Sequence, residues 1–331
     1  MAVFEAKRVA VIGAGAVGSY YGARLAQAGH DVRFLMRRDY DAVSSGGLRI
    51  ESVDGDFVLE SPSIARSSEE IGPVDWVICA LKATSIEDAR ALVAPCIGTD
   101  ARTGDGTRIL VLMNGLGLEE RFAQWFGAER VFGGLAFTCI NRGEPGVVHH
   151  IDYGAINIGH QLDDRSELTA AASLWEGAQV ESTTSPSLLR SRWEKLCWNV
   201  PFNGLAVTSG GITTDRILAD AELRDAARDL ILEVAATGNA DLAAHDERDR
   251  IDGAAMAERM IAATDAMADY RPSTMIDFVE GRPMEVEAIF GEPLRRAQTL
   301  GVATPLMAVL TGQMRALDAS RGSGAGAGRI D

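Results

Sequence analysis

One segment of the chain carries a lysine and two asparagines at a spacing that could serve catalysis. Lys195, Asn199 and Asn203 follow one another at intervals of four residues, so on a helix they would form one polar stripe. The stretch from Leu196 to Thr214 has no charged residue, and an unpaired ammonium group in such surroundings is costly. Such a lysine could donate a proton, while the amides could bind a carbonyl or hydroxyl group. The alternative is a lysine that reaches solvent from a helix end, with two asparagines as structural caps.

A glycine-rich turn near the start of the chain predicts a dinucleotide-binding site. An apolar strand over 8–12 leads into Gly13, Ala14, Gly15, Ala16, Val17 and Gly18, and a helix is expected over 19–28, before Gly29. A second strand follows over 31–35. In this context Gly13 allows the tight turn, Gly15 lets the backbone approach a pyrophosphate, and Gly18 lets the helix pack on the strand. The alternative is a glycine-rich turn without a ligand.

The residues after the second strand indicate which dinucleotide would bind. NAD-specific sites place an acid there to accept a hydrogen bond from the ribose 2′-hydroxyl. This chain has Arg37 and Arg38 instead, and a guanidinium can hold a 2′-phosphate with two hydrogen bonds. We therefore expect NADP(H) as the cofactor. The alternative is that both arginines are solvated loop residues.

The elements that must position these residues form an α/β pattern followed by a helical one. Strands over 75–80 and 108–112 alternate with helices over 85–93 and 118–126, which predicts a parallel sheet covered on both faces. A hairpin is expected from 48–51 and 57–59. Three short strands, over 134–141, 146–151 and 154–159 with turns at Gly143, Gly146 and Gly154, would extend the sheet in antiparallel fashion.

The second half of the chain is predicted to be helical from about Ser185 onward. Pro201 should kink the first of these helices and free the carbonyl of Cys197. The tail from Arg321 is a low-complexity run of Gly, Ser and Ala, and we expect it to be disordered. The expected helices cover 188–207, 215–218, 221–245, 253–267, 274–279, 283–300 and 305–317.

Composition excludes several classes of protein. The 331 residues include 32 Lys and Arg against 47 Asp and Glu, a net charge of −15, so nucleic acid and anionic membranes are not expected partners. The four cysteines form no C-x-x-C pair and the five histidines show no metal-binding spacing, so no metal is expected. Reduced cysteines and an N-terminus without a signal-peptide pattern suggest a cytoplasmic protein.

Taken together, these segments resemble the ketopantoate reductase (2-dehydropantoate 2-reductase) family. The resemblance rests on the glycine motif, on ALKA around Lys82, on MNG around Asn114, on WEKLCWNVPFNGL and on the run from Arg271 to Pro305. It implies an NADP-binding Rossmann-type domain over 1–185, with an antiparallel extension, and an all-α substrate and catalytic domain over 186–320, followed by the tail at 321–331. The implied reaction is NADPH-dependent reduction of 2-dehydropantoate to (R)-pantoate in pantothenate biosynthesis.

The resemblance also implies roles for individual residues. Lys195 would be the general acid, and the residues that match substrate-binding positions are Asn114, Asn199, Asn203 and Ser273. Asn114 would also lie beside the nicotinamide ribose, while the further matches to cofactor-binding positions are Arg37, Lys82 and Glu285. Taken alone, Ser273 could equally be a helix N-cap and Glu285 a first-turn acid that favours the helix dipole.

The chain departs from the family at two places. A further substrate-side asparagine often found about ten residues after Asn203 is missing, and Thr213 would replace it only in part. The small residue that the family sets against the cofactor is not identified by its sequence context near Cys139 and Ile140. The alternatives are therefore a reductase of another small 2-oxo acid, a related 3-hydroxy acid dehydrogenase, or a non-catalytic NADP(H)-binding protein. The chain would act as a monomer or a homodimer.

Overall fold

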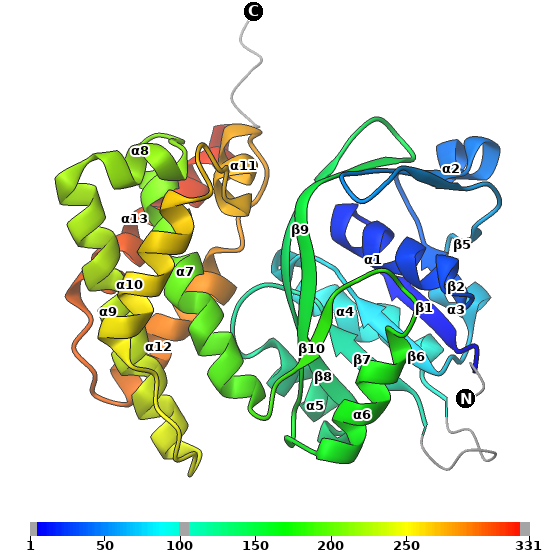
Figure 1. Ribbon diagram of the computed structural model, residues 1–331, viewed down its shortest axis with the longest axis horizontal. Helices are drawn as coiled ribbons and strands as arrows, with labels where there is room; N and C mark the ends of the chain where they lie inside the picture. The colour runs from blue at the N-terminus through cyan, green and yellow to red at the C-terminus, as the bar shows by residue number, and fades with distance from the viewer. Residues whose placement is uncertain (1–4, 99–105, 325–331) are drawn as a thin grey trace, which may run out of the picture. The chain divides into compact units, whose positions relative to one another are not determined.

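The computed structural model describes residues 5–98 and 106–324, which divide into two compact units. Unit 1 contains the residues up to Met113 together with Leu118–Leu188, and unit 2 contains Asn114–Gly117 together with the residues from Leu189 on. The chain thus changes unit at Leu188, and it also sends the short loop 114–117 into unit 2. The sequence did not predict that loop's membership. Figure 1 shows a sheet covered by helices in unit 1 and a cluster of helices in unit 2.

Unit 1 is built on one ten-stranded sheet in the order β4-β3-β9-β8-β7-β6-β1-β2-β5, with β10 paired to β9. Strands β1, β2, β5, β6, β7 and the start of β8 are parallel, as expected for strands joined by helices. The predicted hairpin is confirmed, with Leu48 opposite Leu59. The strands are β1 (Arg8–Ile12), β2 (Asp31–Leu35), β3 (Leu48–Ser52), β4 (Phe57–Leu59), β5 (Ser63–Ala65), β6 (Trp76–Cys79), β7 (Arg108–Val111), β8 (Val131–Arg142), β9 (Val147–His160) and β10 (Ser182–Thr184).

The prediction of three short strands after residue 134 is wrong, because two long strands, β8 and β9, occupy this region. They pair antiparallel along nearly their whole length. The predicted turn at Gly154 is a β-bulge: Tyr153 and Gly154 take φ angles of 60° and 124°, and the strand continues beyond them. Since both neighbours keep pairing across this irregularity, the glycine bends the strand and does not end it.

Helices cover the sheet of unit 1, and its core is formed by apolar side chains of the strands and of α1. Helix α1 begins at Ala16, three residues before the predicted start, and α5 has the predicted bounds. The sequence analysis missed α2, α3, α6, β5 and β10. The helices are α1 (Ala16–Gln27), α2 (Tyr40–Gly46), α3 (Ser68–Ile71), η1 (Ala83–Ser85), α4 (Ile86–Val93), η2 (Ala94–Cys96), α5 (Leu118–Phe126), η3 (Ala128–Arg130) and α6 (Arg165–Leu174).

Unit 2 is helical and has a hydrophobic core of its own, to which Leu116 of the loop 114–117 also belongs. Helix α9 lies against α10, α12 and α13. The helices of unit 2 are α7 (Leu188–Thr208), α8 (Thr214–Ala219), α9 (Ala221–Ala244), α10 (Gly253–Asp265), α11 (Ser273–Val279), the π-helix η4 (Glu287–Gly291), α12 (Glu292–Thr299) and α13 (Pro305–Gly324).

Two predictions for this half need correction. No single helix covers 283–300: residues 283–285 are irregular, η4 follows, and α12 starts at Glu292. The helical run is continuous from Val286 to Thr299, and Pro293 accounts for its π turn, since proline has no N–H to donate to the carbonyl four residues earlier. Helix α13 continues to Gly324, so residues 321–324 are helical where disorder was predicted. The rest of the predicted tail, 325–331, lies outside the described residues.

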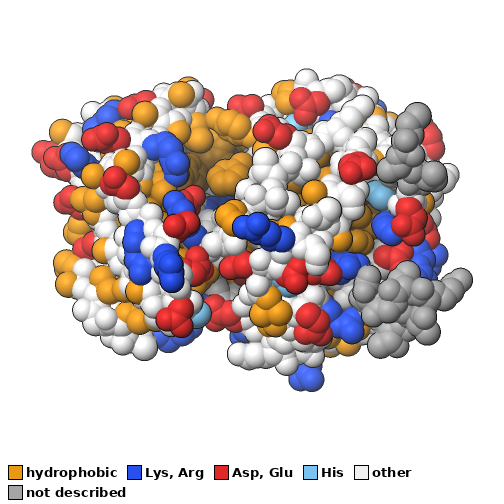
Figure 2. Space-filling model, turned by 60° about the horizontal axis from the view of Figure 1, so that its bottom comes forward, with side chains coloured by type: hydrophobic (Ala, Val, Ile, Leu, Met, Phe, Trp, Pro, Cys, Tyr) orange, Lys and Arg blue, Asp and Glu red, His pale blue; other side chains and the backbone are white. Residues whose placement is uncertain are grey.

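The surface bears both signs of charge. On the face in Figure 2, Lys and Arg side chains are interspersed with Asp and Glu side chains. Within residues 5–98 and 106–324, no helix is both long and apolar enough to cross a membrane.

Candidate active site

The glycine turn is tightly packed at Gly13 and Gly18 and open at Gly15. Gly13 has a φ of 95°, and a Cβ there would lie 2.6 Å from the backbone nitrogen of Leu81, so only glycine fits. A Cβ on Gly18 would lie 2.3 Å from the Gly13 carbonyl oxygen, which ties α1 closely to the turn. At Gly15, in contrast, no atom lies within 4 Å of the position that a Cβ would take, and no side chain caps the start of α1. The N–H groups of the first turn therefore remain available to an anion.

Three cations of unit 1 follow its parallel strands. Arg37 and Arg38 follow the end of β2 after Met36 and are exposed, and neither has an ion-pair partner among the residues that the structure describes. Lys82 follows β6, is exposed, and precedes the short helix η1. All three therefore lie past the carboxyl ends of parallel strands, the edge at which α/β sheets bind ligands.

A hydrogen bond connects the side chains of Lys195 and Asn114, which are 81 residues apart in the sequence. The Lys195 ammonium group donates a hydrogen bond of 3.1 Å to Oδ1 of Asn114, and both residues are half-buried. Lys195 stands inside α7, seven residues after its start and thirteen before its end, so it is not the end-of-helix lysine of the alternative interpretation. This contact lies wholly within unit 2, because the loop 114–117 belongs to that unit.

The loop that carries Asn114 is held against the π-helix η4. The N–H of Leu116 donates to the carbonyl of Ala288 at 3.0 Å. Gly115 has a φ of 115°, and a Cβ there would lie 2.5 Å from the Cβ of Ala288. Glu285, another candidate, is buried just before η4, and its carbonyl accepts from Ile289 at 3.1 Å. Glu285 precedes the helical turn, so it is not a first-turn acid.

The two asparagines of α7 have different surroundings. Asn203 is 1% exposed, and its Nδ2 donates to the carbonyl of Asn199 at 3.0 Å. Its Oδ1 accepts from the N–H of Thr274, also at 3.0 Å, which fastens α11 to α7. Asn199 is buried, and its side chain has no hydrogen bond to any described residue. Both residues lie inside the helix, so neither is a cap.

Ser273 begins α11 and is exposed. Pro272 is the N-cap residue, without a side-chain hydrogen bond, so Ser273 does not act as the cap that its sequence context allows. Thr213, the partial replacement for the missing asparagine, is the N-cap of α8 and is also without a capping bond. The neighbouring Thr214 is fully buried and donates from its backbone N–H to Tyr270 at 3.0 Å. These contacts hold the chain that leads into Ser273.

Sequence reasoning missed a buried ion pair near the Asn114 loop. Arg296 donates to Asp241 at 2.7 Å and to Glu292 at 2.8 Å, and Trp193 donates to the same Asp241 oxygen at 2.9 Å. A Cβ on Gly117 would lie 3.4 Å from Glu292, so this network supports the end of the loop. In the sequence, Arg296, Asp241 and Glu292 stand out only as charged residues of helices, and such residues are normal on solvated helix faces.

The candidates thus fall into two sets. Unit 1 holds the glycine turn, Arg37 and Lys82, and unit 2 holds the rest, namely Asn114, Lys195, Asn199, Asn203, Ser273 and Glu285. Within unit 2, hydrogen bonds connect Lys195 to Asn114 and Asn203 to the start of α11. Such a set of an ammonium group, amides and a hydroxyl can donate a proton and hydrogen bonds to a small polar molecule.

Both parts of the chain match models of one family. Residues 9–162 match "Ketopantoate reductase PanE/ApbA", and residues 187–318 match "Ketopantoate reductase PanE/ApbA C terminal". A 2-dehydropantoate 2-reductase of Nostoc sp. is 36% identical over 324 residues, which are 96% of this chain and 97% of that protein.

Solved structures give the same result. The 2-dehydropantoate 2-reductase of Geobacter metallireducens GS-15 is 43% identical, with a TM-score of 0.87 over 93% of this chain and 99% of that one. D-Mandelate dehydrogenase, solved with NADH and anilino(oxo)acetate, shares the fold, with a TM-score of 0.81 over 95% of this chain and 99% of that one at 22% identity. The chain is therefore an oxidoreductase with a Rossmann-type domain and a helical domain, and it belongs to the ketopantoate reductase family.

Proposed function

We propose that this protein reduces 2-dehydropantoate to (R)-pantoate with NADPH, with Lys195 as the general acid, in pantothenate biosynthesis. The observation that carries the proposal is the hydrogen bond of 3.1 Å from Lys195 to Asn114, in a chain of this family. It pairs the proposed proton donor with a residue that the family resemblance assigns to substrate and cofactor. Curated relatives named 2-dehydropantoate 2-reductase, from Nostoc sp., Mesorhizobium japonicum, Halobacterium salinarum and Caulobacter vibrioides, are 26–36% identical to this chain, which supports the same substrate.

The residues of unit 1 fit a dinucleotide. The open space at Gly15 and the uncapped N-terminus of α1 suit a pyrophosphate, which needs close backbone approach and free N–H donors. Arg37 would hold the 2′-phosphate, and Lys82 and Glu285 would contact other parts of the cofactor. A bound NADPH supplies the hydride that adds to the carbonyl carbon of the oxo acid.

Lys195 would hold the proton that the substrate oxygen needs. Addition of hydride to a ketone builds negative charge on that oxygen, and an ammonium group stabilises the charge and delivers the proton. The Asn114 amide accepts one hydrogen bond from Nζ and so fixes the direction of the ammonium group. Since Gly115 and Leu116 are packed against Ala288, the orientation of Asn114 is set by the backbone.

The remaining polar residues would bind the substrate. Asn199 is 7% exposed and its side chain has no hydrogen bond to a described residue, so it is suited to a substrate hydroxyl or carbonyl group. Ser273 presents an exposed hydroxyl at the start of α11, and it would hold the carboxylate end. Asn203 would serve the substrate with the donor capacity that its two backbone contacts leave free.

Two further properties belong to the proposal. All four cysteines are unpaired and three are buried, which supports the reducing environment of the cytoplasm. We also propose that the chain acts as a monomer or a homodimer; light scattering after gel filtration would measure the mass in solution. A dimeric ketopantoate reductase of Staphylococcus aureus shares the fold at 20% identity.

One observation favours a second candidate, a reductase of another 2-oxo acid. Thr213 stands where the family often has an asparagine, and a fold relative acts on mandelate, which carries an aromatic ring. NADPH oxidation followed by absorbance against a panel of oxo acids separates the two. The panel should hold 2-dehydropantoate, 2-oxoisovalerate, pyruvate and phenylglyoxylate. The highest kcat/KM for 2-dehydropantoate supports the proposal, a higher value for another acid supports the second candidate, and no turnover supports a non-catalytic protein.

A further inference from the structure

The segment that follows β2 contains two arginines and then two acids. Arg37 and Arg38 have no ion-pair partner among the described residues, whereas Asp39 and Asp41 are each paired with an arginine from elsewhere in unit 1. Carboxylates so close to a proposed phosphate site would weaken it, because like charges repel across a few ångströms. The partners of the two acids therefore decide the charge that this site presents.

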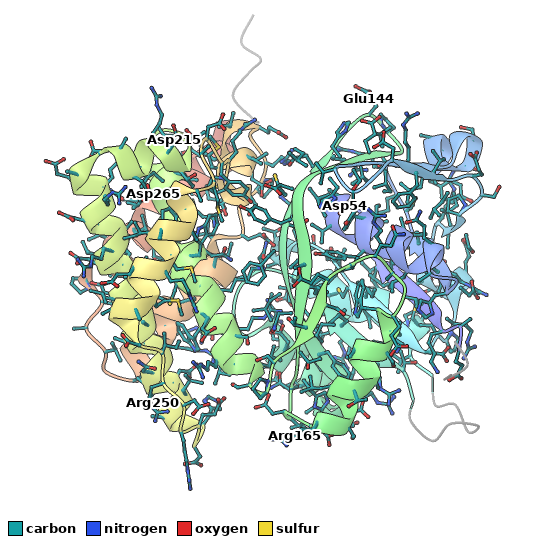
Figure 3. The ribbon with its side chains drawn as sticks, viewed as in Figure 1. Asp54, Glu144, Arg165, Asp215, Arg250 and Asp265 are labelled. Carbon is teal, nitrogen blue, oxygen red and sulfur yellow. The ribbon has the colours of Figure 1, made fainter. Side chains whose placement is uncertain are left out.

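Arg142, the last residue of β8, forms the ion pair with Asp39. Arg142 reaches Asp39 because the turn between β8 and β9 packs against α2. In this turn, a Cβ on Gly146 would lie 3.5 Å from the side chain of Val43. Figure 1 shows this turn beside α2, and Figure 3 labels Glu144 within it. The Asp39 side chain is only 13% exposed, and its Oδ1 is buried without a hydrogen-bond partner. Arg142 is thus the one cation paired with this carboxylate among the described residues.

Arg66 has the corresponding place beside Asp41. It follows β5, whose Ala65 pairs with Leu35 at the end of β2. Its guanidinium donates to Asp41 at 2.7 Å and lies over the ring of Tyr40, 3.8 Å from the centroid. Both side chains are mostly exposed, at 58% and 89%, so solvent screens this pair far more than the pair of Asp39.

We propose that Arg142 is a cofactor-specificity residue, which neutralises Asp39 so that Arg37 and Arg38 meet the 2′-phosphate without a competing carboxylate. This inference rests on the NADPH preference given under the proposed function. An unpaired acid in this turn favours the ribose 2′-hydroxyl of NADH, because a carboxylate accepts from a hydroxyl and repels a phosphate. Arg142 would therefore favour NADPH by removing that charge, and Arg66 would add a smaller effect of the same sign.

The test is a titration of NADPH and of NADH, followed by cofactor fluorescence, with the wild type and Arg142→Gln. The variant should bind NADPH about tenfold more weakly, as expected for one phosphate close to one unpaired carboxylate at a partly screened site. NADH binding should stay the same or become tighter, because the freed carboxylate can accept a hydrogen bond from the ribose 2′-hydroxyl. The double variant Asp39→Asn/Arg142→Gln should recover NADPH binding, because it removes the unpaired charge. Equal losses for both cofactors, or no recovery in the double variant, would overturn the inference.

Arg108→Gln is the matched control. Arg108 begins β7, at the opposite end of the parallel strands from the glycine turn, and it pairs with Glu167 at 2.6 Å. Its loss changes the net charge equally but should leave the ratio of the two affinities unchanged. Arg37→Ala keeps the two proposals apart. If that variant loses NADPH affinity and Arg142→Gln does not, only this inference fails; if neither changes the ratio, the proposed cofactor preference fails.

Discussion

Replacement of Lys195 gives the sharpest test of the proposed chemistry. The chain has only three lysines, Lys7, Lys82 and Lys195, and only the last stands on α7 beside an amide acceptor. Lys195→Ala removes both the proton donor and the positive charge. Lys195→Arg keeps the charge but cannot readily release a proton, because a guanidinium stays protonated at any ordinary pH.

The size of the effect follows from the environment of the ammonium group. Beyond Lys195, α7 has no charged residue up to its end at Thr208, so this part of the helix offers no second charged group that could act as proton donor. Loss of a general acid lowers kcat by about 10²–10⁴, which is about 2.7–5.4 kcal/mol of transition-state stabilisation. We expect Lys195→Ala to fall in this range. Lys195→Arg should recover at most a small part, since charge alone does not transfer the proton.

Steady-state NADPH oxidation with 2-dehydropantoate measures kcat, and NADPH fluorescence measures cofactor binding in the same variants. Cofactor affinity should survive, because the glycine turn and Arg37 belong to unit 1. Lys7→Ala is the control for loss of a lysine outside the site. A Lys195→Ala variant with near-normal kcat would refute the mechanism, and full activity in Lys195→Arg would limit the role of Lys195 to electrostatics.

Three further results are expected. Arg37→Ala should weaken NADPH binding by about 1.5–3 kcal/mol, the scale of a charge-assisted hydrogen bond, and change NADH little in the same titration. Gly115→Ala should lower the free energy of unfolding, measured by denaturant titration, by about 1–3 kcal/mol and reduce kcat, because the new Cβ would lie 2.5 Å from that of Ala288. Gly301→Ala is the control, since Gly301 also has a positive φ, of 69°, but no atom lies within 4 Å of its Cβ position. Burial raises the pKa of all four cysteine thiols, so a thiol reagent should label the native protein slowly and reach half-buried Cys139 first.

The fold was predictable wherever local signals agreed. The glycine turn between β1 and α1, the hairpin of β3 and β4, and the bounds of α5 follow from spacing and turn chemistry that act within about ten residues. The elements that were missed are short, such as α3 and β5, and their residues gain stability from the neighbouring sheet. Local propensity carries little information about such elements, because tertiary packing decides them.

The candidate site was predictable as a set of residue types and not as a set of contacts. The spacing of Lys195, Asn199 and Asn203 indicates one helix face, and all three do lie on α7. The partner of Lys195 could not be derived from spacing, since Asn114 is 81 residues away, in a loop that leaves its sequence neighbours for unit 2. Only the family resemblance associated the two residues with the same substrate.

The π-helix η4 explains why such contacts escape sequence reasoning. Its position before Pro293 comes from a local rule, since a proline ring disfavours the regular α-helical turn that precedes it. What the turn does is not local: it brings the carbonyl of Ala288 to Leu116 and leaves room for Gly115 alone. A residue that looks like a helix breaker in the sequence thus shapes the surface that holds the Asn114 loop. Gly115 and the π turn at Ala288 form one contact, so the role of each residue follows only from the structure that brings the two together.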